Sequence, residues 1–205
     1  MKAKSGDTPT VPTKQARSLK REAILHEAAK LFAKHGFADT DVQVVADRAK
    51  VGKGTVYRYF DDKKGLFLAV SQMVWRELHQ HILERIATGR TAIDRIRLGV
   101  RANLEFFQLH PHYIEIVMIE RATFHDTIEA TQYSYRKSTI MGLHQVLEGA
   151  VQEGSLRRID VSAVADLLCD VTYGTVVAHT LTGRRRELVR QTNLIMDMFR
   201  RGFGK

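Results

Sequence analysis

Beyond residue 12 the chain contains one proline, Pro111, and no segment in which apolar and polar residues alternate over several positions. Apolar residues instead recur at intervals of three and four almost to the C-terminus, which is the period of an amphipathic helix. Because proline breaks a helix from inside, its near absence leaves long helices uninterrupted. The sequence therefore predicts an all-α fold of about nine helices with short connections and no sheet.

The predicted helices follow the apolar stripes and end at residues that stop helices. Gly36 is placed to end the first helix in a left-handed conformation, Asp41 to cap the second, and Asp61 or Asp62 to cap the fourth. The expected helices span residues 18–35, 42–49, 53–59, 63–87, 91–109, 112–121, 124–152, 160–181 and 185–201.

Positive charge is concentrated near the N-terminus. The 205 residues include 32 Lys and Arg against 23 Asp and Glu, a formal net charge of +9. Residues 1–66 hold 14 of these basic and 8 of these acidic side chains, so two thirds of the excess lies in the first third of the chain. Such asymmetry is typical of a nucleic-acid-binding module, but a merely solubilising surface has it too. Charge alone leaves both readings open.

Residues 36–63 contain two short helical stretches separated by a tight turn. The first carries small and β-branched residues. The second, GTVYRYF from Gly54, offers only Val56 and Phe60 to a core and leaves its other side chains free to meet a partner. A helix-turn-helix places such a second helix in the major groove of DNA, with its N-terminal residues at the base edges.

The same segment resembles the TetR (tetracycline-repressor-like) family of bacterial transcription regulators. The chain reads AAKLFAKHGF from Ala28, where the family has Ala-x-x-Leu-Phe-x-x-x-Gly-Phe. It reads VGKGTVYRYFDDK from Val51, where the family has Val-x-x-Gly-Thr-Val/Leu-Tyr-x-x-Phe followed by Lys three positions later. Two positions depart from the family: Lys50 stands where Gly is usual, and Gly52 where Ser is usual. A non-Gly residue in a left-handed turn costs on the order of 1 kcal/mol.

The resemblance implies a DNA-contacting surface built by the two short helices and the residues after them. Lys53 would donate to guanine, Gly54 would let the backbone approach the bases, and Lys63 would bind phosphate. Against this, the aromatic residues of the second helix can simply form a core cluster. The implied DNA-binding residues are Thr40, Val42, Gln43, Lys53, Gly54, Thr55, Tyr57, Arg58, Tyr59 and Lys63.

A near-palindromic operator requires two copies of the motif, and hence a homodimer with two-fold symmetry. The last two predicted helices carry broad apolar stripes that suit this contact, although parts of the same stripes must pack within their own subunit. The expected dimer interface comprises Val164, Leu168, Val171, Thr175, Leu188, Ile195, Met198 and Phe199.

The resemblance also implies a pocket for a small-molecule effector that controls DNA affinity. Aromatic, histidine and sulfur side chains of the C-terminal helices are its candidate lining, although each is individually an ordinary core residue as well. Glu120 and Arg121 interrupt an apolar helix, either as a buried pair that grips a polar ligand group or as a solvated salt bridge. The candidate lining is Trp75, Phe106, Phe107, His110, Tyr113, Met118, Arg121, Phe124, Tyr133, His144, Cys169 and Tyr173.

Catalytic and metal sites find little support. Cys169 is the only cysteine, which excludes an internal disulfide and a cysteine-based zinc site. His79 and His81 are two positions apart and point to different sides of a helix, so they do not face one metal. We expect no metal, no cofactor and no enzyme activity. No apolar run reaches the ~20 residues of a membrane helix, and an apolar signal-peptide core is missing, so we expect a cytoplasmic protein at the bacterial nucleoid, without a membrane partner.

The sequence thus predicts a transcriptional regulator that binds double-stranded operator DNA and is a repressor released by a small-molecule effector. The expected regions are a flexible basic arm at residues 1–15, a helix-turn-helix domain at residues 16–65, and a helical ligand-sensing and dimerisation domain at residues 66–205. The competing hypothesis is a helical ligand-binding or scaffold protein whose basic N-terminal third meets a membrane surface or RNA.

Overall fold

The computed structural model describes residues 13–124, 132–183 and 185–203, which form nine α-helices and one 3₁₀ helix and contain no sheet. The all-α prediction is confirmed. The helices are α1 (Lys14–His35), α2 (Val42–Arg48), α3 (Lys53–Phe60), α4 (Lys63–Ile86), α5 (Ala92–Leu109), α6 (Pro111–Phe124), α7 (Gln132–Gln152), α8 (Val161–Leu181), the 3₁₀ helix η2 (Arg185–Arg190) and α9 (Gln191–Phe203).

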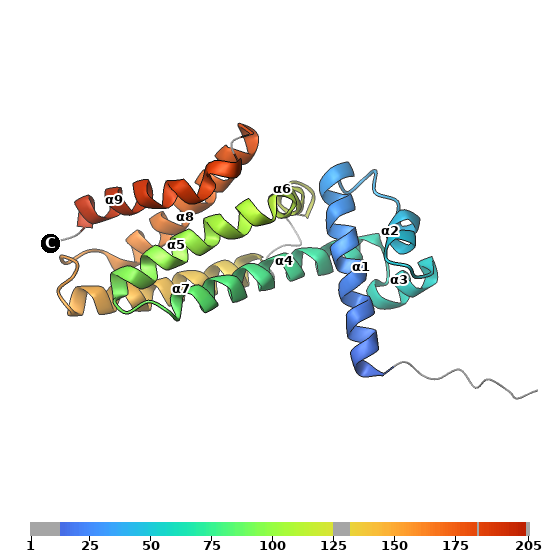
Figure 1. Ribbon diagram of the computed structural model, residues 1–205, viewed down its shortest axis with the longest axis horizontal. Helices are drawn as coiled ribbons and strands as arrows, with labels where there is room; N and C mark the ends of the chain where they lie inside the picture. Colours follow the sequence, from blue (N-terminus) through green and yellow to red (C-terminus); the bar gives the residue numbers. More distant parts are fainter. Residues whose placement is uncertain (1–12, 125–131, 184, 204–205) are drawn as a thin grey trace, which may run out of the picture.

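The molecule is elongated, with a small helical domain at one end of a longer bundle (Figure 1). Helices α1–α3 form the small domain. Helix α4 begins beside it and runs along the bundle, where it lies next to α5 and α7, while α8 and α9 complete the body. One hydrophobic core continues through both parts, from Ile24 and Phe32 in α1 to Phe199 in α9. The α4 helix is therefore shared by the two parts of the protein.

Several helix boundaries differ from the prediction, among them the end of α6, which extends three residues further, to Phe124. Helix α1 begins four residues earlier, at Lys14, because the Thr13 hydroxyl accepts a hydrogen bond from the backbone N–H of Ala16 and caps it. The expected helix over residues 185–201 is divided into η2 and α9. The helix expected to begin at residue 124 begins at Gln132, and residues 125–131 lie outside the described part.

The junction between α3 and α4 depends on Gly65. The Asp62 carboxylate accepts a hydrogen bond from the Gly65 backbone N–H and so caps α4. A Cβ at position 65 would overlap the carbonyl oxygen of Phe60, the last residue of α3. Because a backbone carbonyl cannot move aside as a side chain can, only glycine lets α3 pack this closely on the start of α4.

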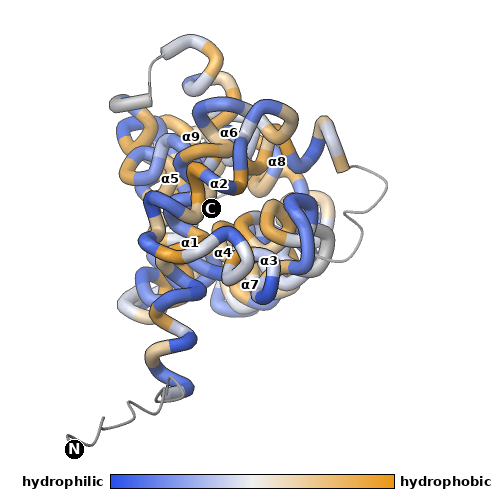
Figure 2. Tube along the Cα trace, turned by 90° about the vertical axis from the view of Figure 1, so that its right-hand side faces the viewer, coloured by the Kyte–Doolittle hydropathy of each residue, from blue (hydrophilic) through white to orange (hydrophobic). Residues whose placement is uncertain are grey.

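Helix α8 is the one helix among the described residues that is long and apolar enough to cross a membrane, judged by length and composition alone. Its apolar residues divide between two faces. Val164, Leu168 and Val176 are buried in the subunit, whereas Leu167, Val171 and Leu181 are exposed. Figure 2 shows hydrophobic and hydrophilic residues interspersed along the helices. A core contact therefore accounts for one face of α8 and leaves the other apolar face unexplained.

Candidate nucleic-acid interface and sensor interior

The α2–turn–α3 unit has the geometry expected of a helix-turn-helix. The Asp41 carboxylate accepts a 2.8 Å hydrogen bond from the backbone N–H of Gln43 and caps α2, as predicted. In the turn, Lys50 has a φ of 54°, so the left-handed conformation expected there is confirmed in spite of the non-glycine residue. Gly52 precedes α3 and provides no side-chain cap. The turn therefore joins α2 to the α3 helix that packs on it, although both of its unusual residues lower its stability.

Helix α3 has one buried and one outward face. Val56 and Phe60 are buried, as the sequence predicted. Gly54, Tyr57 and Arg58 are exposed, and Lys53 and Thr55 are half-buried. The Lys53 ammonium lies 6.0 Å from the centroid of the Tyr57 ring, so both side chains occupy the same side of the helix. The first turn of α3 thus presents hydrogen-bond donors, an aromatic ring and bare backbone to a partner.

Two of the residues expected to contact DNA face the interior instead. Thr40 is 3% exposed, and its hydroxyl donates to the carbonyl oxygen of Gly36 at 2.6 Å and lies 3.3 Å from that of Leu31. Val42 is 4% exposed and belongs to the core. Gln43 is exposed, and its amide donates to the Asp47 carboxylate. At the start of α2, only the Gln43 side chain is therefore available to a partner, whereas the side chains of Thr40 and Val42 stabilise the domain from inside.

Tyr59 and Lys63 are tied to the first helix and its following turn. The Tyr59 hydroxyl donates to the carbonyl oxygen of Arg17 on α1. The Lys63 ammonium donates to the carbonyl oxygen of Ala38 at 2.7 Å and lies 5.1 Å from the Phe37 ring centroid. An ammonium carries three N–H donors, so Lys63 keeps donors for a phosphate, whereas the single Tyr59 hydroxyl hydrogen is already used.

Sequence reasoning missed two basic residues beside the motif. Arg48, at the end of α2, and Lys50, in the turn, are both exposed. Lys50 was considered only for its conformation, although its side chain adds positive charge to the same edge. The density of basic residues over 48–58 was the available signal.

The expected ligand-pocket residues fall into separate groups. Phe106, Phe107 and Tyr113 are buried, and His110 stacks on Tyr113 with ring centroids 5.2 Å apart. Phe124 lies instead at the junction with the small helical domain, 4.9 Å from Phe37 between ring centroids. The remaining candidates divide into half-buried Trp75, Met118, His144, Cys169 and Tyr173, exposed Arg121, and Tyr133, whose side chain lies outside the described part.

Glu120 and Arg121 are not a buried pair. Glu120 is 1% exposed and accepts a hydrogen bond from the Trp75 indole N–H at 3.1 Å, whereas Arg121 is exposed. Nearby, burial raises the pKa of the Tyr173 phenol, the Arg121 charge opposes this, and the Glu120 charge adds to it. Cys169 is also mostly buried, and that burial raises the pKa of its thiol to about 11.

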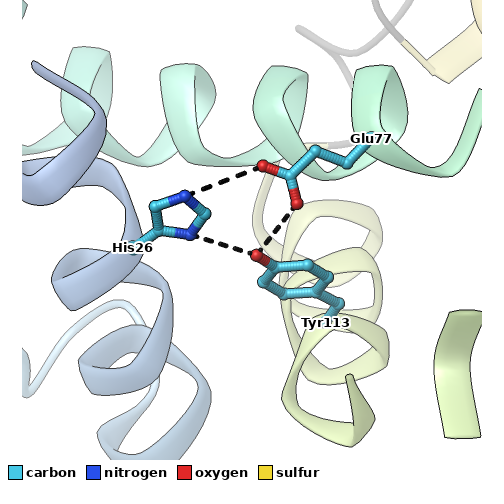
Figure 3. A network of polar contacts seen from close by, with 3 residues as sticks. All are labelled: His26, Glu77 and Tyr113. Atoms are coloured by element: carbon cyan, nitrogen blue, oxygen red, sulfur yellow. Dashed lines mark hydrogen bonds and ion pairs between the residues drawn. The ribbon is translucent and has the colours of Figure 1, made fainter. Parts of the chain in front are cut away.

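A hydrogen-bonded triad connects the two domains (Figure 3). The Tyr113 hydroxyl on α6 lies 3.3 Å from Nδ1 of His26 on α1 and donates to the Glu77 carboxylate on α4 at 3.1 Å. Glu77 also lies 3.9 Å from Nε2 of His26. Beside the triad, Glu77, His81, Phe106 and His110 line an open cleft between α4 and α5 with a volume of about 410 Å³.

Most of the residues expected at a dimer interface are buried in their own subunit. These are Val164, Leu168, Leu188, Ile195 and Phe199. Val171 and Met198 are exposed, and Thr175 is half-buried. The exposed apolar side chains of α8 and α9 form another set, which comprises Leu167, Val171, Leu181, Leu194 and Met198. The stripes were recognised in the sequence, but their inner and outer faces were not distinguished.

Comparisons with known proteins agree with this arrangement. Residues 24–70 match the model of the family described as bacterial regulatory proteins, tetR family. An uncharacterised helix-turn-helix-type transcriptional regulator of Bacillus subtilis, YhgD, is 24% identical over 146 residues, which cover 71% of this chain and 76% of the relative. Two solved structures share the fold. The fatty acid degradation regulator FadR of Bacillus halodurans has a TM-score of 0.78 at 15% identity, and the match covers 87% of this chain and 93% of that chain. FadR of Bacillus subtilis, solved with stearoyl-CoA, has a TM-score of 0.77 at 18% identity over 86% of this chain and 96% of that chain.

Proposed function

The chain belongs to the tetR family of bacterial regulatory proteins, and on that premise we propose that it is a homodimeric repressor that binds a near-palindromic operator and leaves it when a small molecule binds. The proposal places its activity in the bacterial cytoplasm, on the DNA of the nucleoid, and includes no catalytic step. One observation carries it: the outer face of α3 presents Gly54, Tyr57 and Arg58, all exposed, where a groove of DNA can reach them.

In this proposal the contacts of the motif are of two kinds. Lys53, Gly54 and Thr55 approach base edges, where a lysine ammonium donates to guanine O6 or N7. Tyr57, Arg58 and Gln43 contact the sugar-phosphate backbone, and the free donors of Lys63 add a phosphate contact there. The side chains of Thr40, Val42 and Tyr59 do not contact DNA in this proposal. They support the interface indirectly, because they hold α2 and α3 against α1.

We place the dimer contact on the outer faces of α8 and α9. On α8 the exposed residues Leu167, Val171, Gly174, Ala178 and Leu181 follow one another at intervals of three and four, which forms one continuous stripe. Leu194 and Met198 continue the apolar surface one turn apart on α9. Two such faces related by a two-fold axis would form a four-helix contact.

The effector would act through α4 and α6. Helix α4 is continuous from the DNA-binding domain into the bundle. At the end of α6, the Phe124 ring lies 5.1 Å from that of Phe67 on α4 and 4.9 Å from that of Phe37 beside α1. A ligand that favours one placement of these helices changes the separation of the two recognition helices, and with it the affinity for the operator. The stearoyl-CoA in the Bacillus subtilis relative makes an effector with a long apolar part a reasonable starting candidate.

The decisive experiment is the selection of bound duplexes from random DNA, followed by titration of the selected site at several salt concentrations. We expect a near-palindromic site and a binding constant that falls steeply with salt. Lys53→Ala should then relax the base preference at one position per half-site, whereas Tyr57→Phe should weaken all sites alike. Binding without sequence preference at every salt concentration would contradict the proposal.

A further inference from the structure

Glu120 occupies a position where the pattern of α6 calls for an apolar residue. The buried face of α6 comprises Tyr113, Ile114, Ile116, Val117, Glu120 and Phe124. Glu120 is as buried as the aliphatic residues around it, at 1% exposure. A carboxylate in such a place must recover through close contacts the solvation that it loses on burial.

The protein provides only part of that compensation. Trp75 donates one hydrogen bond to Glu120 Oε2, and an ionised carboxylate can accept about four. Among the residues that the structure describes, no Lys, Arg or His forms an ion pair with Glu120, and the neighbouring Arg121 points to solvent. Within the described residues, the negative charge of Glu120 therefore has no cationic partner.

A second polar group nearby is also unpartnered. Ser71 lies one helical turn before Trp75 on the same face of α4 and is 1% exposed, and its hydroxyl has no hydrogen-bond partner in the part of the chain that the structure describes. Ser71 lies on the face of α4 that meets the end of α6: Phe67, one turn before it, lies 5.1 Å from Phe124 between ring centroids, and Trp75, one turn after it, donates to Glu120. On α8, the half-buried Tyr173 phenol is close enough for the charges of Glu120 and Arg121 to act on its pKa, which burial raises, the Arg121 charge lowers and the Glu120 charge raises.

We propose that Glu120 receives the positively charged nitrogen of the effector, a primary ammonium group attached to an apolar body. The ammonium would pair with the carboxylate, donate a second N–H to the Ser71 hydroxyl, and lie near the Trp75 ring, whose face attracts cations. The apolar body would occupy the surrounding sensor interior. The inference rests on the proposed function, because it names the chemical class of the molecule that the regulator senses.

The test uses three probes with the same eight-carbon chain: octylammonium, octanol and octanoate, each added below its aggregation limit to the full-length protein. Trp75 is the only tryptophan of the chain, so its fluorescence reports directly from the proposed site. We expect a saturable change in emission with octylammonium, at least tenfold weaker binding of octanol, and weaker binding still of octanoate. Equal or tighter binding of octanol or octanoate, or no response to octylammonium, would overturn the proposal without any variant.

Variants then locate the contact. Glu120→Gln should weaken octylammonium binding at least tenfold and leave octanol binding unchanged, whereas Glu115→Gln removes a charge from the same helix and should change neither. If Glu120→Gln does not fold, Trp75→Phe keeps the carboxylate, and calorimetry should still show the preference for the ammonium. Selection of DNA sites without any probe tests the proposed regulator separately, so a failed operator is distinguished from a wrong effector class.

Discussion

The Tyr113 hydroxyl lies 3.3 Å from Nδ1 of His26, and this contact joins α6 of the long bundle to α1, the first helix of the small helical domain. Glu77 on α4 accepts a hydrogen bond from the same hydroxyl, so three helices meet at one phenol. Helix α1 packs on α2, and Tyr59 of α3 donates to the Arg17 carbonyl on α1, so under the proposed mechanism a movement of α6 that displaces Tyr113 would reach α2 and α3.

Replacement of Tyr113 by phenylalanine should destabilise the protein measurably. The variant keeps the ring but leaves Glu77 and His26 without the hydroxyl, and the loss of such partly buried hydrogen bonds costs about 1–3 kcal/mol. Urea denaturation followed by circular dichroism measures the change in free energy of unfolding. Tyr57→Phe, which alters an exposed tyrosine, is the matched control and should cost less than about 0.5 kcal/mol. Equal effects of the two variants would show that the triad adds nothing to stability.

Stability should fall when the solution is acidified through pH 6.5. Burial lowers the pKa of His110, which the Glu77 charge partly offsets, and burial and the His110 charge lower the pKa of His112. The unfolded chain therefore takes up more protons than the folded one near pH 6.5, so the free energy of unfolding decreases as the pH falls. Below the lowered pKa values both states are protonated and the decrease levels off.

Denaturation midpoints measured between pH 7.5 and pH 5 check this dependence. The His112→Gln variant should show a shallower decline than the original chain, since one of the two groups no longer titrates. His35→Gln, on an exposed histidine at the end of α1, should leave the slope unchanged. A flat profile for the original chain would contradict the predicted direction.

The buried hydroxyl of Thr40 should matter for folding rather than for direct DNA contact. Thr40→Val removes the hydroxyl that bonds to the Gly36 carbonyl and should lower the free energy of unfolding by about 1–3 kcal/mol. Thr40→Ser keeps the hydroxyl and should recover much of the loss. At a temperature where both variants are folded, their affinities for the selected operator should agree. A specific loss of affinity in folded Thr40→Val would restore the residue to the contact surface.

Disruption of the outer apolar stripe should produce monomers. A charge at Leu167, which is 54% exposed on α8, would have to be buried against the same charge of a partner. Leu167→Glu should therefore halve the mass measured by sedimentation equilibrium at micromolar concentration. Leu109→Glu changes a leucine on α5 that is 61% exposed and should leave the mass of the dimer unchanged. A persistent dimer in Leu167→Glu would place the interface elsewhere.

The sequence predicted those features that depend on neighbouring residues. The cap that Asp41 provides to α2 and the positive φ of Gly36 could be predicted, because both depend on residues within one helical turn. The inward orientation of Thr40 was not predicted, because its burial depends on how the turn after α1 folds back on the end of that helix, where the hydroxyl donates to the Gly36 carbonyl and lies 3.3 Å from that of Leu31. Nor was the triad, since its members lie as much as 87 residues apart. Helical periodicity identifies an apolar stripe, but whether Leu168 or Leu167 faces the core depends on how helices from distant segments pack.

Lys50, in its left-handed conformation, is subject to two opposing selective pressures, one from backbone strain and one from its charge. Glycine there would relieve backbone strain on the order of 1 kcal/mol. It would also remove an exposed positive charge from the edge that faces the proposed DNA, and so weaken association most at low salt. Selection for a more stable fold and selection for a tighter operator complex thus favour different residues at this position, and relatives living at higher temperature should more often have glycine here.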